Sequence, residues 1–519
     1  MHCGTKKRAN SVFFLEPLDC IVRDLHLLSL GVSAERHSGA TLYQQLYDGL
    51  RSAVLDGRLE PGTRLPSTRA AALELGVARN TVIAVFEQLV AEGFLRSRVG
   101  DGTYVADFEP ELLSRPVRKG PKSHRARREE VSGGTVSPLS VRGTAIVGVS
   151  RGAPGPVDGA FQPGLPDIAA FPHRTWARIL ARHARTPEHA RLGYGDAAGD
   201  PRLRTAIAAY VTATRGVRCS PERVVPVAGA QAALDLCVRL LLDPGDSAWI
   251  EEPGYGGARA ALLGAGARIE PIPVDAEGLD VAQGEARCPG ARLAYITPSC
   301  QFPLGATLSL ERRLRLVDWA ERAGAFVIED DYDSEYRYRG RPITALQGLD
   351  ANGRVAYVGT FSKTMFPALR VGYVIAPEGL AAAFAHAVRN TGQSVPQPVQ
   401  GALAEFIDAG HYSRHVRRMR TLYARRRARL FTLVGEHLSD VMELVFCEAG
   451  MQVAGWLVNG LDDRAVAAAG ARAGLALAPL SGYWMNPGGR AGLHLGYAGV
   501  SEEALGQAVP KLARVMGLR

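Results

Sequence analysis

One lysine stands among small, hydroxyl and apolar residues in the stretch 359–375, which reads GTFSKTMFPALRVGYVI. Lys363 follows the apolar run 355–358, and the cation Arg370 comes seven residues later. Most lysines are solvated surface residues, and Lys363 alone would be interpreted in that way. A desolvated lysine near another cation has a lowered pKa, however, and is then an amine that forms imines with carbonyl compounds. The stretch is therefore a candidate for amine chemistry if other groups support it.

Three further side chains that suit a flat ring follow apolar runs. Asp330 comes after the run 326–328 and could pair with a protonated ring nitrogen. Tyr332, two residues later, could donate a hydrogen bond to a ring hydroxylate. Tyr255 follows the run 247–250 and offers an aromatic face. The acidic run 329–333 alone would suggest a solvated segment or a metal site, but no histidine at ligand spacing lies near it, so we expect no metal.

A second group of residues suits a phosphate. Backbone N–H groups at the start of a helix bind anions, and hydroxyls with a bidentate guanidinium complete such a site. The sequence offers both in the set Gly229, Ala230, Gln231, Thr360, Ser362 and Arg370. Phosphate, ring nitrogen, phenolate and aldehyde together describe pyridoxal 5′-phosphate, PLP. Each residue alone is ordinary, and only the joint pattern points to this cofactor.

The elements that must position these residues alternate between strands and helices. From residue 223 onward, apolar runs end again and again in small, polar or charged residues, and helical patterns such as ALDLCVRLLL follow them. This alternation predicts an α/β fold with a mainly parallel sheet. Ligands of such sheets bind beyond the carboxyl ends of the strands, so we expect the candidate residues to meet in one crevice.

A different pattern occupies residues 41–105. An amphipathic helix in TLYQQLYDGLRSAVLDG ends at Gly57, a second helix opens at Ser67 and ends at Gly76, and a third stops at Gly93. Residues 94–98 and 103–105 flank a Gly-Asp-Gly turn, which indicates a hairpin. Three short helices and a terminal hairpin predict a winged helix-turn-helix. An arginine-rich helical unit that packs on a partner protein is the alternative.

In a winged helix-turn-helix the third helix enters the major groove with its first residues. The predicted DNA contacts are therefore Arg79, Asn80 and Thr81 in the reading helix, Arg64, Ser67 and Arg69 toward phosphates, and Arg98 and Gly102 in the wing. The net charge of +9 favours a nucleic-acid partner, but residues 41–105 carry seven Arg and seven Asp or Glu. Much of the excess comes instead from residues 115–128, with seven Lys or Arg and no acid.

The 519 residues are enough for more than one domain. We predict an N-terminal extension (1–38), a DNA-binding domain (39–106), a basic flexible linker (107–157) and a large domain (158–519). The linker prediction rests on residues rich in Pro, Gly, Ser and Arg without periodicity. No apolar run is long enough for a transmembrane helix, and seven dispersed cysteines fit a reducing compartment, so we expect a cytoplasmic protein.

Motifs in both blocks resemble a known family. The stretch LPSTRAAALELGVARNTVIAVFEQLVAEGFLRSRVGDGTYV resembles the GntR-type DNA-binding domain. Residues 161–519 resemble fold-type-I aminotransferases in the version fused to such domains, the MocR/GabR-like subfamily of transcriptional regulators. The segments that carry this resemblance include GYGDAAGDPRLR, EEPGYGGAR, VIEDDYDSEYRY and GTFSKTMFPALRVGY. The resemblance implies a large PLP domain with a mainly parallel sheet and a small C-terminal α+β subdomain.

The resemblance also implies roles for single residues. Lys363 should form the Schiff base with PLP, Asp330 should pair with the pyridine nitrogen, and Tyr332 should pair with the 3′-oxygen. Tyr255 should stack on the ring, while Thr360, Ser362, Arg370 and the backbone from Gly229 to Gln231 should hold the phosphate. Tyr194 should reach the phosphate of the other subunit, since this fold builds its sites at the interface of a homodimer.

The sequence departs from the family pattern at three positions. Ala228 stands where the family usually has a hydroxyl residue, and Cys300 replaces a histidine. His494 stands where aminotransferases place an arginine that grips the substrate carboxylate. Histidine is a weaker, pH-dependent anion partner, so we expect His494 to be a candidate effector contact and transamination of amino acids to be in doubt. Arg490 and Arg259 are the alternatives for the missing cation, although nothing in the sequence places them in the pocket.

The sequence thus predicts a PLP-dependent transcriptional regulator that binds promoter DNA as a homodimer. Its large domain is expected to sense PLP itself, an amine or an amino acid at Lys363. An active aminotransferase that carries a DNA-binding domain is the alternative, which leaves enzyme activity open. A third interpretation is a scaffold that binds no PLP.

Overall fold

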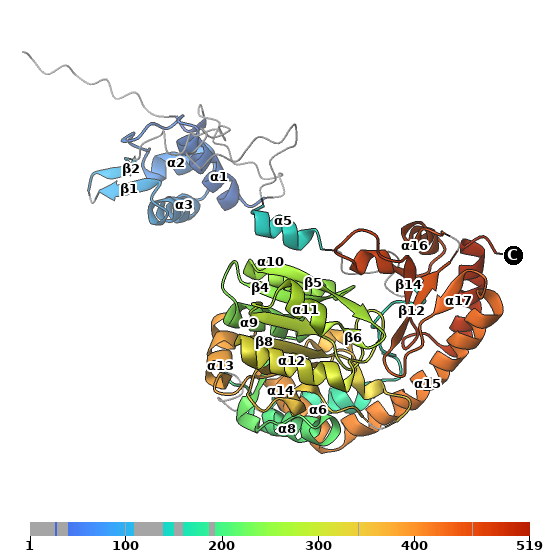
Figure 1. Ribbon diagram of the computed structural model, residues 1–519. Helices are drawn as coiled ribbons and strands as arrows, with labels where there is room; N and C mark the ends of the chain where they lie inside the picture. The colour runs from blue at the N-terminus through green and yellow to red at the C-terminus, as the bar shows by residue number, and fades with distance from the viewer. Residues whose placement is uncertain are drawn as a thin grey trace, which may run out of the picture. The chain divides into compact units, whose positions relative to one another are not determined.

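The computed structural model describes residues 26–28, 40–98, 100–107, 139–149, 159–185, 193–340, 342–458 and 460–518 (Figure 1). The chain divides into two compact units, Met1–Gly134 and Thr135–Arg519. Most of the predicted N-terminal extension and of the predicted linker lies outside the described residues, so the domain boundaries stay predictions. Within the described part, no helix is both long and apolar enough to cross a membrane.

The first unit has the predicted winged helix-turn-helix. Its elements are α1 (Leu42–Leu55), α2 (Thr68–Leu75), α3 (Arg79–Ala91), β1 (Leu95–Arg98) and β2 (Gly102–Val105), and the two strands form an antiparallel hairpin. The side chains expected to face inward from the helices form one core, which also includes Leu27 from the predicted N-terminal extension. Part of that extension therefore packs against the domain.

The turn between α2 and α3 is defined by local capping. Ser67 precedes α2, and its hydroxyl accepts a hydrogen bond from the backbone N–H of Ala70 at 3.2 Å. Gly76 ends the helix with a φ of 65°, in the left-handed region that glycine adopts without a Cβ penalty. These two residues fix where α2 starts and stops, and so set the position of the first residue of α3.

An eight-stranded sheet forms the centre of the second unit within the described residues. Its strand order is β3-β10-β9-β8-β7-β4-β5-β6, and β9, β8, β7, β4 and β5 run parallel, whereas β10 runs against both of its neighbours. The mainly parallel sheet is thus confirmed. The strands are β3 (Val224–Val227), β4 (Ser247–Glu252), β5 (Arg268–Asp275), β6 (Gly278–Leu279), β7 (Leu293–Ile296), β8 (Phe326–Asp331), β9 (Val355–Thr360) and β10 (Gly372–Ile375).

Helices cover both faces of this sheet (Figure 1). Because successive strand residues point to opposite faces, Val355 and Tyr357 join clusters on one face while Ala356 and Val358 join the cluster on the other. The second cluster includes α9 (Ala230–Leu241), α10 (Gly256–Ala265) and α13 (Ala381–Asn390). The opposite face packs against α6 (His173–Arg185), α8 (Pro201–Arg215), α11 (Val281–Arg287), α12 (Leu310–Ala323) and α14 (Gln397–Asp408).

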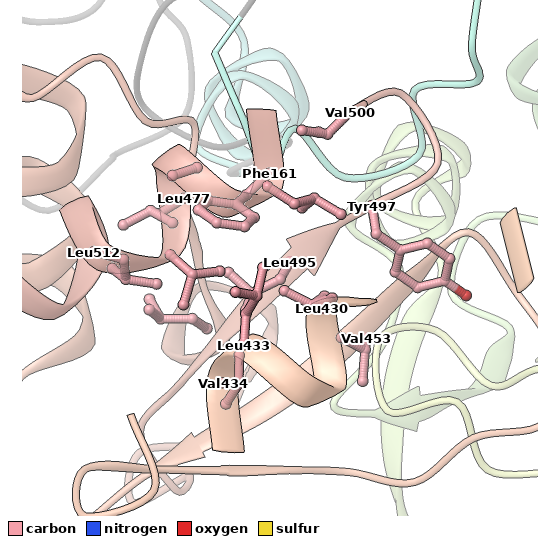
Figure 2. Close-up of a cluster of buried hydrophobic side chains, with 14 of the residues drawn as sticks. Phe161, Leu430, Leu433, Val434, Val453, Leu477, Leu495, Tyr497, Val500 and Leu512 are labelled. Carbon is pink, nitrogen blue, oxygen red and sulfur yellow. The ribbon is translucent and has the colours of Figure 1, made fainter. Parts of the chain in front are cut away.

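A smaller C-terminal subdomain follows the long helix α15 (His411–His437). It holds a four-stranded antiparallel sheet in the order β11-β12-β14-β13. Its elements are β11 (Met442–Leu444), β12 (Gln452–Leu457), α16 (Asp463–Arg472), β13 (Ala478–Pro479), β14 (Gly492–Gly496) and α17 (Glu502–Val515). Figure 2 shows its core, in which Phe161 packs among side chains such as Leu430, Leu477 and Leu495 although it comes from the start of the domain.

Short 3₁₀ helices connect several of these elements. They are Pro221–Arg223, Ser334–Tyr336, Leu346–Leu349, Pro367–Leu369 and Leu480–Tyr483. One further helix, α5 (Val141–Val147), lies inside the range predicted to be a flexible linker. It packs against α10. The side chain of Ile146 lies against Gly264 of that helix, 3.4 Å from where a Cβ on this glycine would be. The linker prediction missed this helix.

Candidate functional site

A cavity of about 280 Å³ opens where β4, β7, β8 and β9 end. Eight segments of the second unit contribute described residues to it, several of them at strand ends, as expected for the carboxyl edge of a parallel sheet. Nine of the residues predicted from the sequence line it: Ala230, Gln231, Tyr255, Asp330, Tyr332, Thr360, Ser362, Lys363 and Arg370. The crevice expected from the sequence therefore exists in the structure.

Lys363 stands just beyond β9 with its amine inside the cavity. Its Nζ donates a hydrogen bond to the carbonyl oxygen of Gly164 at 2.8 Å. Burial lowers the pKa of Lys363, and the carboxylates of Asp333 and Asp330 partly oppose this shift. A Cβ on Gly164 would lie 2.5 Å from Nζ, so this position, whose φ is 68°, requires glycine. The lysine is thus held as a partly desolvated amine, the form that reacts with carbonyl compounds.

Asp330 presents an unpaired carboxylate oxygen. Its Oδ2 accepts a hydrogen bond from the hydroxyl of Tyr295 at 2.8 Å, whereas its Oδ1 is buried and has no hydrogen-bond partner. Burial raises the pKa of Asp330 to about 7, with Asp331 adding to the shift, while Tyr295 and Lys363 lower it. Buried polar atoms normally have partners, so the free Oδ1 indicates a missing donor. A protonated ring nitrogen fits that need.

The opposite part of the cavity suits an anion. Helix α9 begins after Gly229 without a side-chain cap, so its first N–H groups stay available. Arg370 faces this end of the helix. Its guanidinium group donates a hydrogen bond to the carbonyl oxygen of Ala228 at 3.3 Å, and its guanidinium carbon is 3.4 Å from where a Cβ on Gly229 would be. Arg370 has a φ of 52°, which is rare outside glycine. Thr360 and Ser362 add hydroxyls beside it.

Aromatic side chains form another wall of the cavity. Tyr255 is the N-cap residue of α10, and its ring centroid lies 5.4 Å from that of Phe302, with an interplanar angle of 75°. The hydroxyl of Tyr332 lies 3.8 Å from Sγ of Cys300, and burial raises the pKa of Tyr332 well above its usual value. Tyr332 therefore stays protonated and can donate a hydrogen bond into the cavity.

The remaining predicted residues lie elsewhere. Gly229 sits under Arg370 rather than in the cavity wall, and the side chain of Tyr194 is 96% exposed. His494, in β14, is fully buried and is not among the described residues that line the cavity. Its ring packs edge-on against Phe302 and Tyr483, with centroid distances of 5.1 and 5.7 Å. His494 thus stands behind the wall that Phe302 and Tyr483 form.

Several cavity residues were not predicted from the sequence. Tyr295, the partner of Asp330, carries a polar hydroxyl within an apolar run, and this feature could have indicated that its side chain faces a polar site. Gln452 stands as the first residue of β12, far along the chain from Lys363, and no spacing rule links them. The others are Gln162, Pro163, Gly164, Thr297, Phe302, Pro367 and Tyr483.

The predicted DNA-reading residues lie at the start of α3. Arg79 and Asn80 are exposed and Thr81 is half-buried, while the next residue, Val82, is buried in the core. Nε of Arg79 donates to the hydroxyl of Thr68 at 3.4 Å, which ties this arginine to α2. The first turn of α3 therefore presents polar groups outward, as a major-groove reader must.

The wing is built around Tyr104. Arg98 lies over its ring at 5.1 Å and Arg64 at 6.0 Å, and Arg64 also donates to the backbone oxygen of Asp101. Gly102 has a φ of 132°, and a Cβ there would lie 3.1 Å from Nε of Arg64. The hydroxyl of Ser67 is used as the cap of α2, and Arg69 is exposed on that helix. Arg64 and Arg98 thus both pack on the ring of Tyr104.

Comparisons with known proteins agree with both halves of the structure. The family of aminotransferases of class I and II matches residues 171–453, and the gntR family of bacterial regulatory proteins matches residues 42–105. Among solved structures, the α-aminoadipate aminotransferase LysN from Thermus thermophilus, complexed with N-(5′-phosphopyridoxyl)-L-leucine, is similar with a TM-score of 0.64 and 28% identity. That likeness covers 70% of this chain and 92% of LysN. The aminotransferase family implies PLP-dependence.

Relatives that contain both domains match along nearly the whole chain. The probable rhizopine catabolism regulatory protein MocR of Rhizobium meliloti is 44% identical over 92% of this chain and 94% of its own length. The pyridoxine biosynthesis transcriptional regulator PdxR of Corynebacterium glutamicum is 32% identical over 95% of this chain and all of its own length. The chain therefore belongs to the MocR-like group of GntR-type transcriptional regulators, in which a winged helix-turn-helix is joined to an aminotransferase class I and II domain.

Proposed function

We propose that this regulator binds PLP in the cavity through Lys363 and that a small molecule reaching that site changes its binding to promoter DNA. The free Oδ1 of Asp330 carries the proposal, because it is a buried acceptor without a donor in the same cavity as a desolvated lysine. PLP, when bound, supplies an aldehyde that takes up amines and a ring that draws electrons from them.

The described residues divide the work of holding the cofactor. Asp330 pairs with the ring nitrogen, Tyr332 donates to the ring oxygen and Tyr255 covers one face of the ring. Arg370, the start of α9 and the hydroxyls of Thr360 and Ser362 bind the phosphate. These roles use an unpaired carboxylate oxygen, uncapped helix N–H groups and the protonated phenol of Tyr332, whose acceptor in this structure is Sγ of Cys300 at 3.8 Å.

Sensing fits this site better than turnover of amino acids. A transaminating enzyme grips the substrate carboxylate with a bidentate cation, but the corresponding position holds His494. Burial lowers the pKa of His494 to about 3, and Lys363 adds to the shift, so its ring is neutral at cellular pH. A ligand acts as an effector when it binds two conformations of the regulator with different affinity.

We further propose that the regulator is a cytoplasmic homodimer. Tyr194 is compatible with this, because its side chain is 96% exposed in one chain and is therefore accessible to a second copy. In the proposed dimer Tyr194 reaches the phosphate of the partner's cavity. Two DNA-binding domains in a dimer would contact two half-sites of an operator.

Chemical trapping tests the cofactor proposal. Borohydride reduction of the purified full-length protein should fix the phosphopyridoxyl group on one peptide, that of Lys363. Lys363→Ala should lose both the label and the visible absorption of the cofactor, and Lys511→Ala, on α17, is the matched control. A label on another residue, or no uptake of PLP by the wild type, would contradict the proposal.

A separate measurement tests the DNA-reading residues. Arg79→Ala combined with Thr81→Ala should weaken promoter binding by ~1–3 kcal/mol, the range for base and phosphate contacts of this kind. Arg51→Ala, on α1 with its guanidinium over Phe94, serves as the control. Unchanged affinity of the double variant would show that another surface reads the DNA.

Enzymatic turnover is tested directly. The PLP-loaded protein is mixed with a panel of amino acids and a keto-acid acceptor, and product is measured over time. We expect at most a single slow conversion of bound cofactor. Sustained turnover would identify an active aminotransferase instead of a dedicated sensor.

A further inference from the structure

Positive charge in the cavity is confined to two residues. Among the described residues that line it, only Lys363 and Arg370 are cations. Arg370 faces the start of α9 and belongs to the phosphate end, and Lys363 is the amine that holds the cofactor. Among the described residues that line the cavity, the space beyond Lys363 therefore has no cation of its own.

Uncharged polar groups occupy that space instead. Gln452, the first residue of β12, is buried, and its Oε1 has no hydrogen-bond partner. Both side chains lie close to Gly164: a Cβ placed on that glycine would be 2.5 Å from Nζ of Lys363 and 3.6 Å from Oε1 of Gln452. The side-chain amide of Gln452 is therefore near the amine of Lys363. Tyr483 and Gln162 line the same cavity. The unpaired Oε1 indicates that a hydrogen-bond donor is missing here.

The residue behind this space does not supply a charge either. Nδ1 of His494 lies 3.5 Å from the hydroxyl of Tyr483, and its Nε2 is buried without a partner. The groups that face it are the rings of Phe302 and Tyr483, with Lys363 as the cation that acts on it through space. A second cation this close to Lys363 would be unfavourable, which agrees with a neutral imidazole.

We propose that the effector of this regulator is a hydroxyl-bearing amine without a carboxylate group. The inference rests on the proposed function, since the amine is taken to reach the cofactor held by Lys363. Among the described residues the cation nearest this space is Lys363, which is taken up in holding the cofactor, so a carboxylate here would be buried without a cation of its own, which is costly. A hydroxyl, in contrast, can donate a hydrogen bond to the free Oε1 of Gln452.

Matched pairs of ligands test the proposal. Each pair is an amino alcohol and the amino acid with a carboxylate in place of its CH₂OH group: serinol with L-serine, ethanolamine with glycine, and 4-aminobutanol with 4-aminobutyrate. Binding to the PLP-loaded full-length protein is measured by calorimetry and by the change in visible absorption. We expect at least one alcohol to bind about tenfold or more tightly than its acid, the effect of about 1.4 kcal/mol.

Two substitutions locate the preference. His494→Arg should bring in the missing cation and raise the affinity for the acids, whereas His494→Gln, the uncharged control at the same position, should not. Gln452→Leu should weaken the binding of the preferred alcohol and leave its acid unchanged. Circular dichroism and PLP content confirm that each variant is folded and loaded.

The outcomes separate the two proposals. If the wild type takes up no PLP, the proposed function fails before any amine is added. If the loaded protein binds the acids as tightly as the alcohols or more tightly, or binds no alcohol at all, the inference about the effector is overturned while PLP binding stands. Preference for the alcohols, reversed by His494→Arg, supports it.

Discussion

Lys363 and Asp330 are shifted by burial toward their neutral forms. Burial is the largest cause in both cases: it lowers the pKa of the lysine and raises that of the aspartate to about 7. Their mutual attraction opposes both shifts but does not reverse them. A ligand with a protonated ring nitrogen would restore a charged partner to Asp330, so binding and the ionisation of this carboxyl are coupled.

This coupling predicts a pH dependence of stability. In cofactor-free protein the pKa of Asp330 rises from 3.8 to about 7, so the folded state holds a proton that the unfolded state releases between these values. Stability from this group is then lost as pH rises through that window. Asp330→Asn should remove this pH dependence. The free energy of unfolding of the variant, relative to that of the wild type, should therefore increase as pH rises from about 4 to 7, by up to about 1.4 kcal/mol per pH unit.

Urea unfolding of cofactor-free protein at several pH values measures this difference. Asp318→Asn, an exposed carboxylate on α12, is the control. With PLP bound the order should reverse, since the variant cannot pair with the ring nitrogen. A stability difference that does not change with pH would contradict the account of a desolvated carboxyl.

Single residues were predictable where they followed a strand. Lys363, Asp330 and Tyr255 come two to five residues after the last residue of an apolar run, and the geometry of parallel sheets brings such positions together. Gln452 and Gly164 were not predictable in this way, because they enter the cavity from a separate subdomain and from a segment without periodicity. Their positions depend on tertiary packing, which local sequence patterns do not predict.

At the scale of elements, helix α5 shows what periodicity could not reveal. Its sequence VRGTAIV contains glycine and β-branched residues, which favour helix poorly. The hydroxyl of Ser140 caps it by accepting a hydrogen bond from the N–H of Gly143 at 3.0 Å, and packing against α10 further stabilises the helix. The winged helix-turn-helix, in contrast, was predictable because its helices have regular apolar spacing and glycine stops.

The position of α5 leads to a second prediction. Val149, just after α5, lies beside Tyr255 and Tyr483, two residues of the cavity wall. Ile146→Asp should place a charge against α10 and detach the helix, which would appear as faster hydrogen exchange in residues 139–149. It should also reduce the effect of an effector on DNA binding, because the cavity wall would lose its contact with this segment.

Val147→Asp is the matched control for this experiment, since Val147 is 74% exposed whereas Ile146 is 37% exposed. It should leave exchange in α5 and the effector response close to those of the wild type. Equal behaviour of the two variants would mean that docking of α5 plays no part in the response.

Over the whole molecule, the charge is distributed unevenly. The net charge is +9, and residues 115–128 contribute seven Lys or Arg without an acid. Replacing these seven with Gln should lower non-specific DNA affinity, and the slope of log K against log salt should become shallower by about 0.9 for each lost phosphate contact. Filter binding or fluorescence anisotropy over a range of salt concentrations measures the slope.

Sequence specificity should survive the same replacement, because base contacts are assigned to α3. A variant with an unchanged slope would show that residues 115–128 only connect the domains. A loss of specificity with an unchanged slope would place base recognition in this segment instead of α3.

The path of the chain around Phe161 has a thermodynamic consequence. Phe161 is anchored in the core of the C-terminal subdomain with a φ of 75°, and three residues later the carbonyl of Gly164 accepts the hydrogen bond of Lys363. The lysine and the subdomain are therefore joined by a segment too short to absorb displacement. A ligand that draws Lys363 away from Gly164 therefore pulls on the segment that anchors Phe161, so ligand affinity at the lysine and the packing of the subdomain core are coupled, and each changes the other by the same free energy.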